Sequence, residues 1–321
     1  MLRSHEWGDA MGLQDRTPTT AEEYALFPER FSNWGRWGSD DQRGTINLVT
    51  PAVTAAASTL VREGRSVSLA LPIGPTRASL PSGFEHEMSV GAAGSGDTLH
   101  MRFHGWSITH LDSLCHMFTG PGGQLYNGAP SSMVDSEGAH SGSVDAFASG
   151  IVTRGVLYDV PRFRGVPHVA LDAPVHGWEL QDIAAATGIT PRSGDAVVIR
   201  SGAGEFYRAT SQFGWGMAGQ MPGVHASAVE FLYETDAALV VWDLLESGGT
   251  GLPSRLRADG EAIPMHEICI PFMGMPLVDN ADLEALAETC SELGRWEFLL
   301  TVAPLPVVGG TGSPVNPLAV F

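Results

Sequence analysis

The sequence predicts an α/β fold, formed as a single domain around a mixed sheet. Short apolar segments, such as 196–200 (AVVIR) and 238–242 (ALVVW), alternate along the chain with helical patterns. A chain of 321 residues is long enough to bury a large core, and α/β domains of this length often form one unit. Because no glycine cluster matches a dinucleotide-binding or phosphate-loop fingerprint, we expect no nucleotide cofactor.

Composition narrows the classes of partner. Hydrophobic residues make up 43% of the chain and charged residues 17%, which is typical of a globular protein. The net charge of −18 argues against nucleic acid and against anionic membranes, so we expect a small-molecule substrate. No apolar run is long enough to cross a bilayer, and the N-terminus lacks the apolar stretch of a signal peptide. These features favour a cytoplasmic protein.

The first third of the chain predicts few regular elements. Residues 1–30 are polar and mixed, and we expect an extended N-terminal arm there. Thr50 and Pro51 form a cap and first-turn pair for a helix that runs to about residue 63. The Gly-, Pro- and Ser-rich residues 74–98 predict a long loop, and residues 99–108 predict a strand leading into a histidine-rich segment.

The rest of the chain has clearer periodicity. Apolar runs predict strands, amphipathic stretches predict helices, and Gly- or Ser-rich stretches predict loops. The expected elements are strands at 65–71, 150–160, 196–200, 238–242 and 297–302, helices at 178–187, 222–232 and 281–293, and loops at 246–263 and 309–317.

Residues 103–116 (FHGWSITHLDSLCH) hold three imidazoles and one carboxylate, the side chains of His104, His110, His116 and Asp112. On a strand, His110 and Asp112 point to the same face, and a turn after Asp112 would bring His116 back to them. Imidazoles and carboxylates bind divalent metals, and imidazoles transfer protons near neutral pH. The segment therefore predicts a functional site, although structural ion-pair networks produce similar patterns.

Residues 109–116 (THLDSLCH) resemble the signature of the cyclase family, which includes kynurenine formamidase, isatin hydrolase and related amide and lactone hydrolases. Other resembling segments are WGRWGSDDQRGTINL, SGDAVVIRSG, PGVHASAVEFL and APLPVVGGTGSPVNP, so that the resemblance runs from about residue 33 to residue 319. It implies a swivelling β/β/α-like fold, a catalytic domain over residues 31–321, and a homodimer or homotetramer.

The resemblance also implies a divalent metal, Zn²⁺ or Mn²⁺, and a proton-transfer role for His116. The metal ligands that it implies are His110, Asp112, His266 and Asp279.

Two ligand positions depart from the family pattern. Trp106 occupies the position of the first histidine, and an indole cannot ligate a metal; Asp279 replaces a glutamate. His104 shares a predicted strand face with Trp106 and could supply the missing imidazole, as could His100. A mononuclear site, or a member of the family without metal, remains the alternative.

Other residues are candidates for the substrate pocket. Trp106, Phe213 and Trp215 could stack on a planar substrate or simply belong to the core, and His225 could reach the pocket or cap a helix. Asp243 ends a predicted strand and could orient a ligating histidine.

We therefore expect a metal-dependent hydrolase in which metal-activated water opens or cleaves a small cyclic or aryl amide or lactone. The alternative is a metal-independent lyase, dehydratase or cyclase that uses His104, His110 and His116 as acid and base. A third possibility is a non-catalytic binding protein that keeps the fold.

Overall fold

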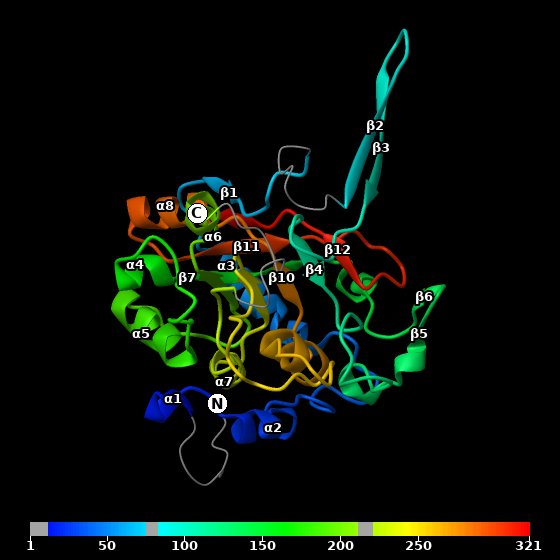
Figure 1. Cartoon of the computed structure of the whole chain (residues 1–321). Coiled ribbons are helices and arrows are strands. Elements are labelled where there is room, and N and C mark those ends of the chain that lie inside the picture. Colours follow the sequence, from blue (N-terminus) through cyan, green and yellow to red (C-terminus); the bar gives the residue numbers. More distant parts are fainter. Residues whose placement is uncertain (1–11, 75–82, 211–220) are drawn as a thin grey trace.

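A computed structural model describes residues 12–74, 83–210 and 221–321 (Figure 1). Phe213 and Trp215 therefore lie outside the described residues. Within the described part, nine strands form one sheet in the order β1-β13-β11-β7-β8-β9-β10-β4-β12. These strands are β1 (Ser66–Ser68), β4 (His110–Asp112), β7 (Ile151–Asp159), β8 (Ala196–Arg200), β9 (Leu239–Trp242), β10 (Leu277–Asp279), β11 (Glu297–Val302), β12 (Gly312–Pro314) and β13 (Leu318–Val320).

Helices pack on this sheet, and two small hairpins lie outside it. The helices are α1 (Gly12–Asp15), α2 (Ala21–Arg30), α3 (Pro51–Ser58), α4 (Val160–Arg164), α5 (Gly177–Thr187), α6 (Ala203–Thr210), α7 (Ala228–Glu234), α8 (Glu284–Leu293) and a π-type segment, η6 (Met265–Met273). The hairpins are β2 (Phe84–Val90) with β3 (Ser95–Met101), and β5 (Val134–Asp135) with β6 (Gly138–Ala139).

The four strands β7, β8, β9 and β10 are parallel, and their neighbours on both sides are antiparallel. The sheet is buried on both faces. On β8, Val197 and Ile199 face one hydrophobic cluster, whereas Ala196 and Val198 face the other. Burial on both sides explains why this strand is continuously apolar instead of alternating. The predicted single α/β domain with a mixed sheet is confirmed.

Local sequence signals place several elements correctly. The Thr50 hydroxyl accepts the Val53 N–H and Pro51 opens α3, as predicted, but the helix ends at Ser58. Gly188 ends α5 in the left-handed conformation that favours glycine. Strands β7, β8, β9 and β11 and helix α8 also lie where the periodicity predicts them.

Three loop and strand predictions are wrong. Residues 84–101, most of which were expected as loop, form the β2–β3 hairpin, which projects from the body of the protein in Figure 1. Residues 102–108, expected as strand, form loop and bends before β4. Residues 312–314, expected as loop, form β12, which pairs with β4. The hairpin strands carry mostly polar side chains, and β12 pairs with a strand far away in the sequence. Local hydrophobic periodicity reveals neither kind of pairing.

The extended arm expected for residues 1–30 is wrong for residues 21–30, which form α2. Thr20 and Glu23 make a reciprocal capping box at its start. Tyr24 and Phe27 are buried in the same hydrophobic cluster as Val197 of β8. The segment is thus part of the folded core, because burying two aromatic rings stabilises the helix against η6 and the rest of this cluster.

Among the described residues, no helix has both the length and the hydrophobicity that crossing a membrane requires.

Candidate metal centre

Strand β4 carries the centre of the site. It lies between β10 and β12, and its register places His110 opposite Asp279 on one side and Pro314 on the other. His110 and Asp112 lie two residues apart and are both almost fully buried. Their Nε2 and Oδ1 atoms are 3.4 Å apart, so the prediction that they share a strand face is confirmed.

Two loop histidines complete this side of the site. His104 places Nδ1 at 2.8 Å from Asp112 Oδ1, although it lies in the 102–109 loop and not on a strand face as expected. A turn in which the His116 N–H bonds to the Ser113 carbonyl returns the His116 ring, as predicted. Its Nε2 is 3.8 Å from Asp112 Oδ2, and its ring stacks on that of His104 at 4.0 Å.

The other side of Asp112 faces His266 and Asp279. His266, on the first turn of η6, places Nε2 at 3.5 Å from Asp112 Oδ2 and 3.2 Å from Asp279 Oδ2. The second oxygen of Asp279 accepts the Trp242 indole N–H. Asp279 therefore reaches the site despite its short side chain, because the antiparallel pairing of β10 with β4 brings its backbone close.

These residues form two groups of three ligand atoms that share Asp112. Within each group, all ligand atoms lie within 4.8 Å of one another. The groups are His104, His110 and Asp112, and Asp112, His266 and Asp279.

The donor set fits a divalent cation. Both Asp112 oxygens and His104 Nδ1 are buried and lack a hydrogen-bond partner, even though the two residues approach to 2.8 Å. Buried polar atoms without partners are costly, and a cation between them would satisfy these atoms together. Imidazole and carboxylate donors of this kind suit Zn²⁺ and Mn²⁺.

The pKa shifts of Asp112 and His266 favour a negatively charged centre, which would attract a cation. Burial opposes ionisation of Asp112, but the imidazoles around it, first His116 and then His104, hold its pKa well below the usual range. Burial also disfavours protonation of His266, yet Glu246 and Asp279 raise its pKa well above the ordinary value. Because a bound cation would take the place of the His266 proton, this carboxylate environment also favours a metal.

The site lies at a cavity of about 390 Å³. Polar residues of the two groups and Glu246 line one part of it, and apolar side chains line the remainder. The apolar wall comprises Trp106, Met117, Leu245 and Ile263, and Arg257 also lines the cavity. This volume suits a small molecule with an apolar portion.

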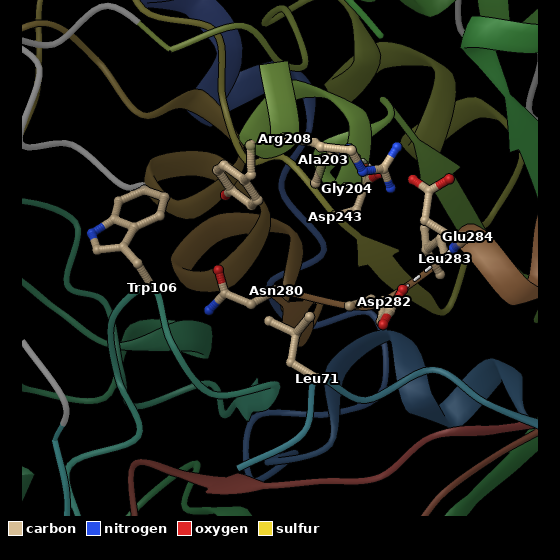
Figure 2. A pocket seen from close by; sticks show the side chains of 12 residues that line it. Leu71, Trp106, Ala203, Gly204, Arg208, Asp243, Asn280, Asp282, Leu283 and Glu284 are labelled. Carbon is tan, nitrogen blue, oxygen red and sulfur yellow. Dashed lines mark hydrogen bonds between the residues drawn. The ribbon is translucent and has the colours of Figure 1, made fainter. Parts of the chain in front are cut away.

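Trp106 lines this cavity and two others. One is a neighbouring pocket of about 300 Å³; Figure 2 shows Trp106 and Asn280 on one side of it and Arg208 and Glu284 on the other. The second is a groove of about 870 Å³ along the base of the β2–β3 hairpin, which also reaches His104. Trp106 thus lines all three cavities and also packs against the core, and its role in substrate binding stays a prediction.

Two candidates lie elsewhere. His225 does not line the described cavity; its Nδ1 lies 3.2 Å from Ser227 Oγ and its ring contacts that of His176. Asp243 does not orient a histidine, because its carboxylate accepts the backbone N–H groups of residues 201, 202, 203 and 244. It instead fixes the turn between β8 and α6, so the expected orienting role is wrong.

The residue that orients His266 is Glu246, which the sequence analysis missed. Its Oε1 lies 2.7 Å from His266 Nδ1. The available signal was an acidic residue shortly after the buried strand β9, close in sequence to Asp243. Likewise, Thr311 contacts His104 from a stretch expected to be loop.

Together, the fold and the site define a class: α/β proteins whose mixed sheet holds a cluster of histidines and aspartates that could bind a divalent metal. The chain belongs to the cyclase family, whose family model (Cyclase) matches residues 34–247. His266 and Asp279, which the resemblance implied as ligands, lie outside that match, and the structure places both beside Asp112.

Solved structures agree with this assignment. A structure described as a novel cyclase is 29% identical, with a TM-score of 0.76, and the match covers 91% of this chain and 100% of that chain. Isatin hydrolase A from Ralstonia solanacearum is 21% identical, with a TM-score of 0.57, over 85% of this chain and 98% of its own; its likeness shows the fold. No curated protein matches the chain.

Proposed function

We propose that the protein is a metal-dependent hydrolase that cleaves or opens a small cyclic or aryl amide or lactone. The observation that carries the proposal is the pair of ligand groups sharing Asp112 beside a small cavity. Membership of a family with isatin hydrolase among its structural neighbours supports the same class of reaction. We propose Zn²⁺ or Mn²⁺ as the metal, because the donors are imidazole and carboxylate.

A divalent metal at this centre would polarise a substrate carbonyl and lower the pKa of bound water. His104, His110, Asp112, His266 and Asp279 would hold it. Asp112 bridges the two groups, and the low pKa of its carboxyl keeps it ionised and able to do so.

His116 is the candidate acid and base. Burial lowers its pKa to about 4, so the imidazole is neutral near pH 7 and can accept a proton. It lines the cavity, stacks on His104 and leaves Nε2 near Asp112, which places the proton acceptor beside the ligand groups. In hydrolysis, His116 would take a proton from the attacking water and deliver it to the leaving amine or alcohol.

The cavity wall suggests the kind of substrate. Trp106 contributes an aromatic ring to the cavity lining, and Met117, Leu245 and Ile263 add apolar side chains to the same cavity as the charged residues. A substrate with a flat apolar ring next to its reacting carbonyl fits both surfaces. We also propose that the protein acts as a homodimer or homotetramer, as its family resemblance implies.

The test combines metal content with activity. The purified protein, its His110→Ala variant and a His140→Ala control would be assayed by mass spectrometry for bound metal and screened against aryl amides and lactones. His140 is half-exposed and pairs with Asp135, away from the centre. We expect metal and activity in the wild type and control, and loss of both in His110→Ala. Activity that survives complete metal removal would refute the proposal.

The metal-independent lyase is less well supported. This alternative was suggested by Trp106, which occupies the position of a histidine ligand in the family pattern. In the structure, His104 supplies an imidazole to the ligand group of His110 and Asp112 instead. Turnover by metal-free protein that depends on His116 would restore it. A non-catalytic binding protein would show metal or ligand binding without turnover of any substrate.

A further inference from the structure

Each of the three histidines in the two ligand groups has a hydrogen-bond partner on the ring nitrogen that points away from Asp112, and these partners differ in kind. The partner of His266 is Glu246, which is 2% exposed. Glu246 Oε1 accepts two hydrogen bonds from His266, one from the backbone N–H at 3.0 Å and one from Nδ1 at 2.7 Å. Since a carboxylate can only accept, Nδ1 carries a proton, and Nε2 is the ring atom that faces Asp112 and Asp279, where a cation would take the place of its proton.

The other two histidines have uncharged partners. His110 Nδ1 donates to the Ile108 carbonyl at 2.8 Å, which also directs Nε2 towards Asp112. His104 Nε2 lies 3.0 Å from the Thr311 hydroxyl, which leaves Nδ1 facing Asp112. Each of the three rings therefore presents one nitrogen to Asp112, and only His266 has an anionic partner on its other nitrogen.

The ligand group that contains His266 also carries more negative charge than the other group. The group of His104, His110 and Asp112 contains one carboxylate, which it shares. The group of Asp112, His266 and Asp279 contains two carboxylates, and Glu246 lies directly behind its imidazole. A carboxylate partner raises the basicity of a ligating imidazole, and removing such a partner typically weakens metal binding by about 10- to 100-fold.

We propose that Glu246 is a positioning residue that makes the two ion positions unequal. The position at Asp112, His266 and Asp279 holds its ion tightly. The position at His104, His110 and Asp112 holds its ion more weakly and exchanges it. This inference rests on the proposed metal-dependent function, and it adds which position is occupied first and which residue decides the order.

The inequality has a consequence for the reaction. His116 stacks on His104, so the weaker position lies beside the candidate acid and base. Weaker donors leave a cation more electrophilic. The tighter position would then organise Asp112, and the weaker one would supply most of the polarisation of the substrate.

The experiment is a stepwise titration of the metal-stripped full-length protein with Co²⁺, followed by visible absorption and calorimetry, with ion counts by mass spectrometry. The variants are Glu246→Gln, which keeps the shape but removes the charge, and Thr311→Val, which removes the uncharged partner of His104. The matched control is Glu261→Gln. Like Glu246, Glu261 accepts two hydrogen bonds, in its case from the backbone N–H groups of Gly249 and Gly251, but it lies outside the two ligand groups.

We expect two binding events in the wild type with dissociation constants at least tenfold apart. Glu246→Gln should weaken the tighter event by about 10- to 100-fold and leave the weaker one within about threefold. Thr311→Val should weaken only the other event, with its own change in the Co²⁺ spectrum, and Glu261→Gln should match the wild type. Thermal unfolding of the metal-free variants checks that each one is folded.

Several results would overturn the inference. Two indistinguishable events in the wild type, equal weakening of both by Glu246→Gln, or an effect no larger than that of Glu261→Gln would each do so. One ion per wild-type chain would also overturn it, while leaving a mononuclear hydrolase in place. Failure of the proposed function itself would look different: the folded wild type would bind no Co²⁺, or it would bind Co²⁺ and turn over none of the aryl amides and lactones in the screen.

Discussion

Tyr24→Phe tests whether α2 is bonded into the core. The Tyr24 hydroxyl donates to Glu267 Oε2 at 2.9 Å, and both residues are 1% exposed. The substitution removes one hydrogen bond to a charged acceptor and leaves the ring packing in place. Hydrogen bonds to charged groups contribute about 1.5–3 kcal/mol, and we expect the free energy of unfolding to fall by that amount.

The loss should stay within this range because Glu267 keeps other donors. Its carboxylate also accepts the Ser254 hydroxyl and the backbone N–H groups of Arg255 and Ile263. The carboxylate would therefore not become an unpaired buried charge, which would cost more.

Urea unfolding followed by circular dichroism measures the difference, and the melting temperature should fall by about 2–4 °C. Tyr126→Phe serves as a comparison, because its hydroxyl bonds to the less buried Asp41 at 3.1 Å and should contribute less. A change below about 0.5 kcal/mol for Tyr24→Phe would show that the bond to Glu267 does not stabilise the fold. A loss above about 4 kcal/mol would contradict the claim that Glu267 keeps enough partners.

Three further predictions concern the fold, pH and the metal centre. Gly44→Ala should lower the free energy of unfolding, measured in urea, by about 2–5 kcal/mol. Gly44 has φ +54°, and a Cβ at this position would lie 1.8 Å from the Gly274 carbonyl oxygen. Stability close to that of the wild type would refute this close approach. Burial raises the pKa of Glu230 to about 7, so ionisation of this carboxyl destabilises the folded protein as the pH rises from about 4.5 to 7. The free energy of unfolding of Glu230→Gln should therefore exceed that of the wild type by about 1–2 kcal/mol at pH 8 and should equal it below pH 4.5. Unfolding curves at both pH values test the sign, and an equal gain at both would contradict it. Trp106→Phe should keep the full metal content measured by mass spectrometry, whereas His104→Ala should lower it by one ion per chain; the reverse pattern would show that the ligand group is assigned wrongly.

The sequence predicted the buried strands well because their signal is local. In β8, every residue from Ala196 to Ile199 is apolar, and the structure buries that strand on both faces. Capping and helix-ending signals at Thr50 and Gly188 were equally reliable, since each acts within a few residues of the backbone it satisfies. By contrast, the β2–β3 hairpin carries polar and exposed side chains, and its pairing could not be distinguished from loop by hydrophobicity.

The residue pattern of 103–116 anticipated part of the candidate centre, and the family resemblance added His266 and Asp279. The spacing of His110 and Asp112 fixes their common face once the segment is a strand, and the clustered histidines of 103–116 mark the region as functional. The sequence could name His104 as a substitute for the missing ligand, but its reason was wrong. The ring reaches Asp112 from a loop that Asn280 holds by bonds to the carbonyls of Gly105 and Ile108.

By itself, then, the sequence determined the fold class, the core strands and the chemistry of one short segment, because these depend on periodicity and on residues that are neighbours along the chain. The family resemblance implied His266 and Asp279 as ligands, but only the tertiary structure shows how these distant residues reach Asp112. The pairing of β10 with β4 brings Asp279 to the site, and the start of η6 brings His266. Glu246, in the segment that follows β9, orients His266. Such meetings are set by strand register and by the packing of elements far apart in sequence, and no local pattern of side chains records them.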